Sequence, residues 1–239
     1  MTEPLFRTDP YLAVATGRVT AHTPDGGVVL DATVFYPTGG GQPGDSGRLD
    51  WSDGSVTIAT TIRAEDGQIV LVPDAGQPLP PLGTDVRQVL DWARRYRIMR
   101  MHTALHLLSV VIPLPVSGGA IGEARSRLDF DMPEAPGDRD ALEAELTRLV
   151  ASDLPVEASW ITDAELDANP GLVKTMSASP PRGAGHVRLI RIGEGAGQVD
   201  LQPCGGTHVA RTGEIGKIRL GKVEKKGRQN RRVYLHLDD

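Results

Sequence analysis

The sequence predicts an α+β protein with a β-rich amino-terminal part, and three observations lead to this prediction. β-branched residues and turn formers dominate the chain from Tyr11 to about Arg87. A helical pattern of apolar residues then begins near Asp91. Strand-like runs return in the last third of the chain. We therefore predict two domains, a β-rich domain over residues 1–88 and an α+β domain over residues 89–239.

The composition suits a globular protein. A chain of 239 residues with 39% hydrophobic residues is long enough for one large or two modest domains, and this excludes the disordered class. No apolar run approaches about 18 residues, so we predict no membrane span and no membrane partner. The amino terminus does not resemble a secretory signal, and we expect a cytoplasmic protein. Cys204 is the single cysteine, which excludes an internal disulfide and leaves a thiolate available as a ligand.

In the amino-terminal part, apolar and β-branched runs at residues 27–35 and 56–62 predict strands. Asp66 and Gly67 form a turn signal between one such run and the apolar residues 69–72, which predicts a hairpin. Residues 73–83 are dense in proline and glycine and predict a loop.

The second part combines helices with strands. Apolar spacing predicts a helix from Asp91 until Pro113 ends it, and a second helix over residues 138–151. Thr162 with Glu165 three residues later is a capping-box pattern that predicts a short third helix. We predict further strands over residues 186–192, 198–201, 215–223 and 231–237.

Two motifs predict a metal site: residues 101–106 (MHTALH) and residues 204–208 (CGGTH). In each motif the two metal-competent residues are four apart, so a helical turn would place them on one face. Thiolate and imidazole are ligands that zinc prefers, and we predict that His102, His106, Cys204 and His208 bind one Zn²⁺. A single histidine on so apolar a segment is more often a packed core residue, but two at this spacing favour metal binding.

The first motif differs from that of zinc peptidases, which place a glutamate base directly after the first histidine, where this chain has Thr103. This argues against a peptidase or amidase. Four protein ligands complete a tetrahedron and describe a structural zinc, whereas catalysis needs an open position. The sequence leaves these two roles of the metal open.

Three consecutive glycines, Gly39, Gly40 and Gly41, precede Gln42 after an apolar strand. Their backbone can approach a ligand closely. The segment lacks the lysine and the following helix of a phosphate-binding P-loop. We predict a functional loop that does not bind nucleotides.

The net charge of -5 hides a segregation of sign along the chain. Residues 129–167 are strongly acidic, whereas residues 217–232 carry eight basic side chains against the single acidic Glu224. A local basic surface is therefore compatible with an acidic protein. A solvated hairpin tip is the competing interpretation of this basic run.

The chain resembles the stand-alone alanyl-tRNA editing proteins, relatives of the editing domain of alanyl-tRNA synthetase. The resemblance spans nearly the whole chain, and its most specific segments are residues 35–47 (FYPTGGGQPGDSG), 101–109 (MHTALHLLS) and 202–216 (QPCGGTHVARTGEIG). Residues 126–132 (SRLDFDM) and 224–235 (EKKGRQNRRVYL) are also similar to family segments. The resemblance implies a small barrel-like amino-terminal domain and an editing domain of the type common to threonyl- and alanyl-tRNA synthetases.

The resemblance implies a hydrolase that removes serine, or as a second candidate glycine, from mischarged alanine tRNA, with zinc as cofactor and no obligate protein partner. A non-catalytic tRNA-binding module with structural zinc is the alternative. The four metal ligands, Gln42 and Thr103 are the expected catalytic residues. We expect Gln42, Thr103 and the backbone of Gly39, Gly40 and Gly41 near the serine hydroxyl. The sequence departs from the family at Leu105, where synthetase editing domains often carry threonine. We also expect residues 174–185 to form a mobile loop near the pocket. The expected tRNA contacts are Arg94, Arg95, Arg97, Arg100, Lys225, Lys226, Arg228, Arg231 and Arg232.

Overall fold

The computed structural model describes residues 2–175 and 185–238, and the chain divides into two compact units, Met1–Tyr96 and Arg97–Asp239. The fold is α+β, as predicted. Most of the loop expected at residues 174–185 lies outside the described residues. The predicted domain boundary between residues 88 and 89 stays a prediction.

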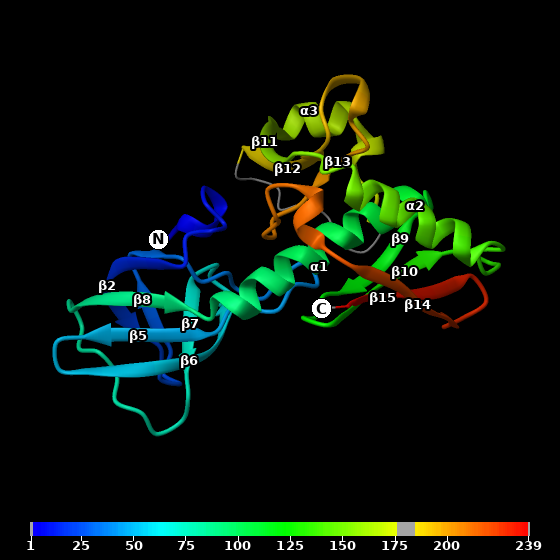
Figure 1. Ribbon diagram of the computed structural model, residues 1–239. Coiled ribbons are helices and arrows are strands. Elements are labelled where there is room, and N and C mark those ends of the chain that lie inside the picture. Colours follow the sequence, from blue (N-terminus) through cyan, green and yellow to red (C-terminus); the bar gives the residue numbers. More distant parts are fainter. Residues whose placement is uncertain (1, 176–184, 239) are drawn as a thin grey trace. The chain divides into compact units, whose positions relative to one another are not determined.

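Six antiparallel strands of the first unit close into a barrel, seen in blue to cyan-green in Figure 1. Side chains alternate along the strands: Val56 and Ile58 are buried, whereas Thr57 between them is exposed. The predicted hairpin is confirmed, because Ile62 pairs with Val70 across the turn. The strands follow the order β2 (Val14–His22), β3 (Val28–Leu30), β7 (Ile69–Pro73), β6 (Gly54–Arg63), β5 (Gly47–Trp51) and β8 (Asp85–Leu90).

The strand predicted over residues 27–35 is interrupted. It forms β3 and the two-residue β4 (Ala32–Thr33), which pairs with β1 (Glu3–Pro4) outside the barrel. The reason lies at Asp31, whose carboxylate accepts the backbone N–H groups of Arg18 at 2.7 Å and Ala32 at 2.8 Å. This local bonding competes with a regular strand ladder.

One apolar cluster fills the barrel and extends to the segment that follows β4. Each large side chain buried there contributes about 1.5–3 kcal/mol relative to exposure. The rings of Phe6 and Tyr36 meet edge to face with centroids 5.3 Å apart. The cluster includes Phe6, Val28, Leu30, Phe35, Tyr36, Leu49, Ile58 and Leu71.

The helix α1 (Trp92–Val111) is the longest element, and the division between the two units falls within it. Asp91 begins the helix, since its carboxylate accepts the N–H of Arg94 at 3.1 Å. The helix ends before Pro113, as predicted. No helix in the described part of the chain is long and apolar enough to cross a membrane.

The second unit contains two antiparallel sheets with two shorter helices. One sheet has the order β14 (Ile218–Lys225), β15 (Asn230–Leu237), β10 (Arg125–Asp131) and β9 (Val116–Ala120), and the other β11 (Val156–Thr162), β12 (His186–Ile192) and β13 (Asp200–Pro203). The helices are α2 (Arg139–Ala151) and α3 (Asp163–Ala168), and α3 has the predicted capping box.

Two strands, β13 and β14, are displaced from their predicted ranges. β13 begins and ends two residues later than expected, and residues 212–215 form a 3₁₀ turn ahead of β14. Gly216 ends this turn with a φ of 72°, a conformation that favours glycine and prevents the strand from starting at residue 215.

Candidate functional site

Helix α1 supplies the first two residues of the site. His102 and His106 lie one turn apart on the same face, and each is only 7% exposed. Their ring centroids are 5.3 Å apart. The helix therefore presents two imidazoles side by side, as their spacing predicted.

The loop after β13 supplies Cys204 and His208. This segment is irregular, so the expectation of a helical turn here is wrong. Two adjacent glycines disfavour a helix, and the loop is instead fixed by Arg188 of β12. The Arg188 Nη1 donates to the carbonyl oxygens of Cys204 and Gly206, both at 2.9 Å. A nearly buried guanidinium thus holds the carbonyls on either side of the loop's first glycine.

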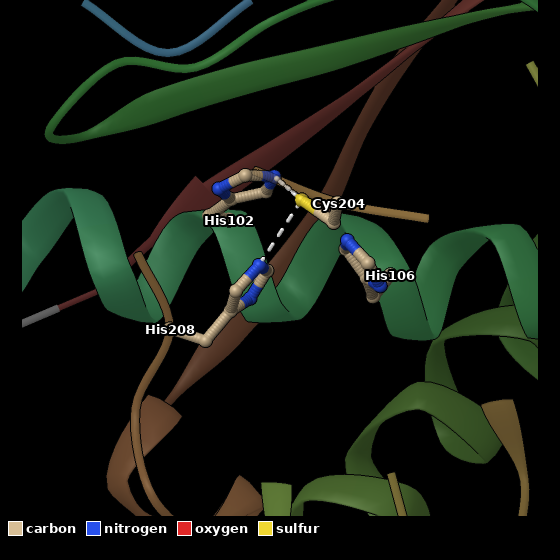
Figure 2. Close-up of side chains that lie close together, drawn as sticks. All are labelled: His102, His106, Cys204 and His208. Carbon is tan, nitrogen blue, oxygen red and sulfur yellow. Dashed lines mark hydrogen bonds between the residues drawn. The ribbon is translucent and has the colours of Figure 1, made fainter. Parts of the chain in front are cut away.

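The four side chains converge, as Figure 2 shows. One ligand atom from each of His102, His106, Cys204 and His208 lies within 4.8 Å of all the others. The Sγ of Cys204 is 3.4 Å from His102 Nε2 and 3.3 Å from His208 Nε2. In a tetrahedral zinc site with ordinary bond lengths, neighbouring ligand atoms lie about 3.5 Å apart. The quartet thus forms a possible metal-binding group, in which the two distances from Cys204 Sγ match those of such a site.

The electrostatics favour ligand forms that bind cations at two members of the quartet, Cys204 and His208. Burial tends to raise the pKa of Cys204, but the charges of His102 and His208 lower it well below its usual value. Burial together with neighbouring His102 also lowers the pKa of His208 well below normal. Thiolate and neutral imidazole are the forms in which these side chains bind metal.

Asp200 of β13 lies directly behind His106. It is 3% exposed, and its Oδ2 accepts from His106 Nδ1 at 2.9 Å and from Gln202 Nε2 at 2.7 Å. Lys174 Nζ pairs with its other oxygen at 2.6 Å. Burial opposes the charge of Asp200, but the hydrogen bond from His106 and the nearby cations lower its pKa to about 2. For His106, burial acts against protonation, whereas the bonds to Asp200 and Cys204 raise its pKa to about 9.

Asp200 and Gln202 were missed in the sequence, although a signal exists. Asp200, Gln202 and Cys204 occupy alternate positions in the sequence. In a strand, side chains at alternate positions lie on the same face. A polar residue at each alternate position leading to the single cysteine was the available indication.

Thr103 packs against the quartet with its side chain fully buried. Its Oγ1 donates to Met99 O at 2.9 Å, accepts the N–H of Val209 at 3.3 Å, and lies 3.2 Å from His208 Nδ1. The expected contact of Thr103 with a substrate hydroxyl stays a prediction.

In the first unit, the glycine-rich segment forms a tight turn. Gly39 and Gln42 exchange two backbone hydrogen bonds of 3.0 Å, and Gly40 and Gly41 both have positive φ, 58° and 82°. These are the requirements of a two-residue hairpin turn that excludes most side chains. The three glycines are exposed, whereas the Gln42 side chain is 1% exposed.

A buried ion pair anchors this segment. Arg95 and Asp45 pair with side chains that are 0% and 3% exposed, and Asp45 accepts the N–H of Tyr36 at 2.5 Å. Arg95 also donates to Val34 O at 2.6 Å and Pro10 O at 3.0 Å. The prediction that Arg95 contacts tRNA is wrong, because its guanidinium has no exposed surface and binds the protein itself.

The other basic residues divide into two groups. Lys225, Lys226 and Arg228 are exposed at the β14–β15 turn, where Lys226 pairs with Glu224 at 2.9 Å. Arg231, by contrast, is 8% exposed and donates to backbone carbonyls, including Gly227 O at 3.1 Å. Its predicted contact with tRNA is wrong, because this nearly buried guanidinium binds the protein itself.

The remaining candidates are partly exposed and engaged within the protein. Arg94 donates to Gly44 O at 2.8 Å, and Arg100 donates to Ile215 O at 2.9 Å. Arg232 pairs with Asp129 at 2.7 Å. Arg97 is half-buried on α1.

Two families match parts of the chain. Residues 187–234 match the threonyl and alanyl tRNA synthetase second additional domain, and residues 15–94 match the class II (A) tRNA synthetases. The first match includes Cys204 and His208, and the second includes the barrel strands.

Curated relatives match over the full length. Proteins named alanyl-tRNA editing protein AlaX-M from Methanosarcina acetivorans and Methanosarcina barkeri are 34% and 36% identical, with 100% of both chains covered in each comparison. An alanine–tRNA ligase from Pyrobaculum arsenaticum is 37% identical over 94% of this chain, which spans 25% of that ligase. With this identity over its whole length, the chain belongs to the alanyl-tRNA editing protein family.

Proposed function

We propose that this protein deacylates mischarged alanine tRNA, hydrolysing the ester that joins serine, or as a second substrate glycine, to the 3′ end of the tRNA. The observation that carries the proposal is the largely buried quartet of three histidines and one cysteine in a member of the editing family. An aminoacyl ester is reactive enough to suit a site in which no glutamate base follows the first histidine.

We further propose that the quartet binds Zn²⁺. The donor set of thiolate and imidazoles and the distances of 3.3 and 3.4 Å support this choice of metal. When bound, zinc acts as a Lewis acid toward a carbonyl oxygen. The protein's own contribution is to hold the ligands in place: Arg188 fixes the loop of Cys204, and Asp200 orients His106.

Selectivity for serine requires recognition of a hydroxyl, because serine is larger than alanine and a size limit cannot spare the smaller substrate. Polar groups that bind the hydroxyl and stay unpaired when alanine enters penalise alanine by about 1–3 kcal/mol. We propose the amide of Gln42 and the backbone of Gly39, Gly40 and Gly41 for this role. The positive φ of Gly40 and Gly41 supports it, since their backbone carries no side chain to hinder a ligand.

For the tRNA, we propose that Lys225, Lys226 and Arg228 contact phosphates, together with Arg97 on α1. The exposure of the three residues at the β14–β15 turn supports this assignment. Contacts with phosphates position a nucleic acid without reading its sequence.

A second candidate function is a non-catalytic tRNA-binding module with structural zinc. Four protein ligands in one cluster favour it, because they fill a tetrahedral site completely. Deacylation activity separates the two candidates.

The experiment measures release of serine from Ser-tRNA(Ala), with Ala-tRNA(Ala) as the paired substrate. Zinc-loaded protein is compared with Cys204→Ala, and with His186→Ala as a control histidine that is exposed and outside the quartet. We expect serine release with alanine spared, lost in Cys204→Ala and retained in His186→Ala. Absence of serine release from the zinc-loaded protein favours the binding module instead.

A further inference from the structure

We propose that Thr103 and Asp200 are positioning residues that select one tautomer in each of two metal ligands, His208 and His106. In this tautomer Nδ1 carries the proton and Nε2 presents its lone pair to the cation. The inference rests on the proposed metal binding and goes beyond it, because it assigns roles to two residues that do not bind the metal.

The hydrogen bonds of Thr103 determine the tautomer of His208. A threonine hydroxyl has one proton to donate and two lone pairs to accept. The proton is used by Met99 O at 2.9 Å, and one lone pair accepts the N–H of Val209 at 3.3 Å. The contact of 3.2 Å to His208 Nδ1 can then be a hydrogen bond only if Nδ1 donates. The lone pair of His208 is therefore on Nε2, the atom that lies 3.3 Å from Cys204 Sγ.

The hydrogen-bond donors and acceptors around His106 determine its tautomer in the same way. Gln202 Nε2 is near its Nδ1, at 3.1 Å, but has two acceptors of its own, Asp200 Oδ2 at 2.7 Å and Ser109 Oγ at 3.3 Å. The two amide protons of Gln202 are used there. Nδ1 of His106 therefore donates to the Asp200 carboxylate at 2.9 Å and leaves Nε2 for the cation.

The two positioning residues cross-link the segments that supply the ligands. Thr103 on α1 orients His208 of the loop, and Asp200 on β13 orients His106 of α1. Lys174 balances the buried charge of Asp200 through an ion pair. Among the contacts described for residues 2–175 and 185–238, no hydrogen bond joins Lys174 to His106. Each segment thus orients a ligand belonging to the other, so the geometry of the quartet depends on residues outside it.

The test measures Zn²⁺ affinity by competition with a chromogenic chelator. Thr103→Val keeps the shape of the side chain and removes the hydroxyl, whereas Thr103→Ser keeps the hydroxyl. We expect Thr103→Val to weaken zinc binding about 10–100-fold and Thr103→Ser to stay near wild type. We expect Asp200→Ala to weaken binding similarly, and Lys174→Met, which removes only the ion pair, to have the smaller effect. Far-UV circular dichroism checks that each variant is folded.

A second readout reports the tautomer directly. Long-range ¹H–¹⁵N spectra, recorded before and after zinc loading, distinguish protonated from unprotonated imidazole nitrogens. We expect a protonated Nδ1 for His208 in the wild type and in Thr103→Ser, and loss of this single tautomer before zinc loading in Thr103→Val. If Thr103→Val does not fold, Thr103→Ser and the comparison of Asp200→Ala with Lys174→Met carry the test.

Three results overturn the inference. Unchanged zinc affinity in Thr103→Val and Asp200→Ala removes both positioning roles while the metal proposal stands. Equal losses in Thr103→Val and Thr103→Ser mean that the packing of the whole side chain matters and not the hydroxyl specifically. A wild-type protein that does not bind zinc overturns the metal proposal together with the positioning roles.

Discussion

Removing the charge of Asp45 tests how the glycine-rich segment is held. Asp45→Asn leaves the Arg95 guanidinium, which has no exposed surface, without its counter-ion, and weakens the hydrogen bond to the Tyr36 N–H. Breaking a buried ion pair by neutralising one partner costs about 3–5 kcal/mol, because the remaining charge stays buried. The bonds from Arg95 to Val34 O and Pro10 O persist and place the expected loss at the lower end of that range.

The assay is urea unfolding followed by far-UV circular dichroism. With a slope of about 2 kcal/mol/M, a loss of about 3 kcal/mol lowers the midpoint by about 1.5 M. The matched control is Asp50→Asn in the same barrel, where Asp50 pairs with Arg48 and Arg87, whose side chains are 53% and 56% exposed. Exposed pairs contribute about 0–1 kcal/mol, so the control should shift little. Equal, small shifts in the two variants would refute the reasoning that burial makes the Asp45 pair important.

Three further predictions concern recognition and pH. Charge reversal of Lys225 and Lys226 to glutamate should weaken tRNA binding and flatten its salt dependence, measured by filter binding across a salt series, and an unchanged slope excludes this turn from the interface. Gln42→Ala should reduce the ratio of serine to alanine release in paired deacylation assays, and an unchanged ratio rejects the assignment of Gln42 to the serine hydroxyl. For Asp129, burial tends to raise the pKa, but hydrogen bonds from Arg232 and Arg127 outweigh it and lower the pKa in the folded state. This carboxylate therefore stabilises the fold above its unfolded pKa of about 3.9, and the contribution is lost as pH falls through the lower folded value. Unfolding free energies of the wild type should fall more steeply below about pH 4 than those of Asp129→Asn, and parallel curves would contradict this.

Local patterns were enough for several elements of the secondary structure. The capping box at Thr162, the turn at Gly67 and the end of α1 before Pro113 each depend on neighbours within a few residues, and each was predicted correctly. Predictions failed where a side chain competes with the backbone or where a turn intervenes. Asp31 interrupts a strand by binding backbone N–H groups, one of them 13 residues away.

The four members of the possible metal-binding group were also predictable, because their residue types and their spacing can be read directly from the sequence. The sequence did not predict that an irregular loop brings Cys204 and His208 to the histidines of α1. The contact that holds this loop comes from Arg188, which lies on another strand. The hydrogen bonds of Thr103 with His208 and of Asp200 with His106 likewise span 105 and 94 residues.

The presence of a charged residue in the sequence does not indicate whether its side chain is exposed to solvent. Arg95 and Arg231 look like their more exposed basic neighbours in the sequence, but tertiary packing buries both. Their guanidinium groups donate to backbone carbonyls, and Arg95 also pairs with the carboxylate of Asp45. Residue type and spacing were sufficient to predict the fold class and the four side chains of the possible metal-binding group, because these depend on local geometry and ligand preference. Exposure, tautomers and the partners of each charge depend on contacts between distant segments, and only the folded chain brings those segments together.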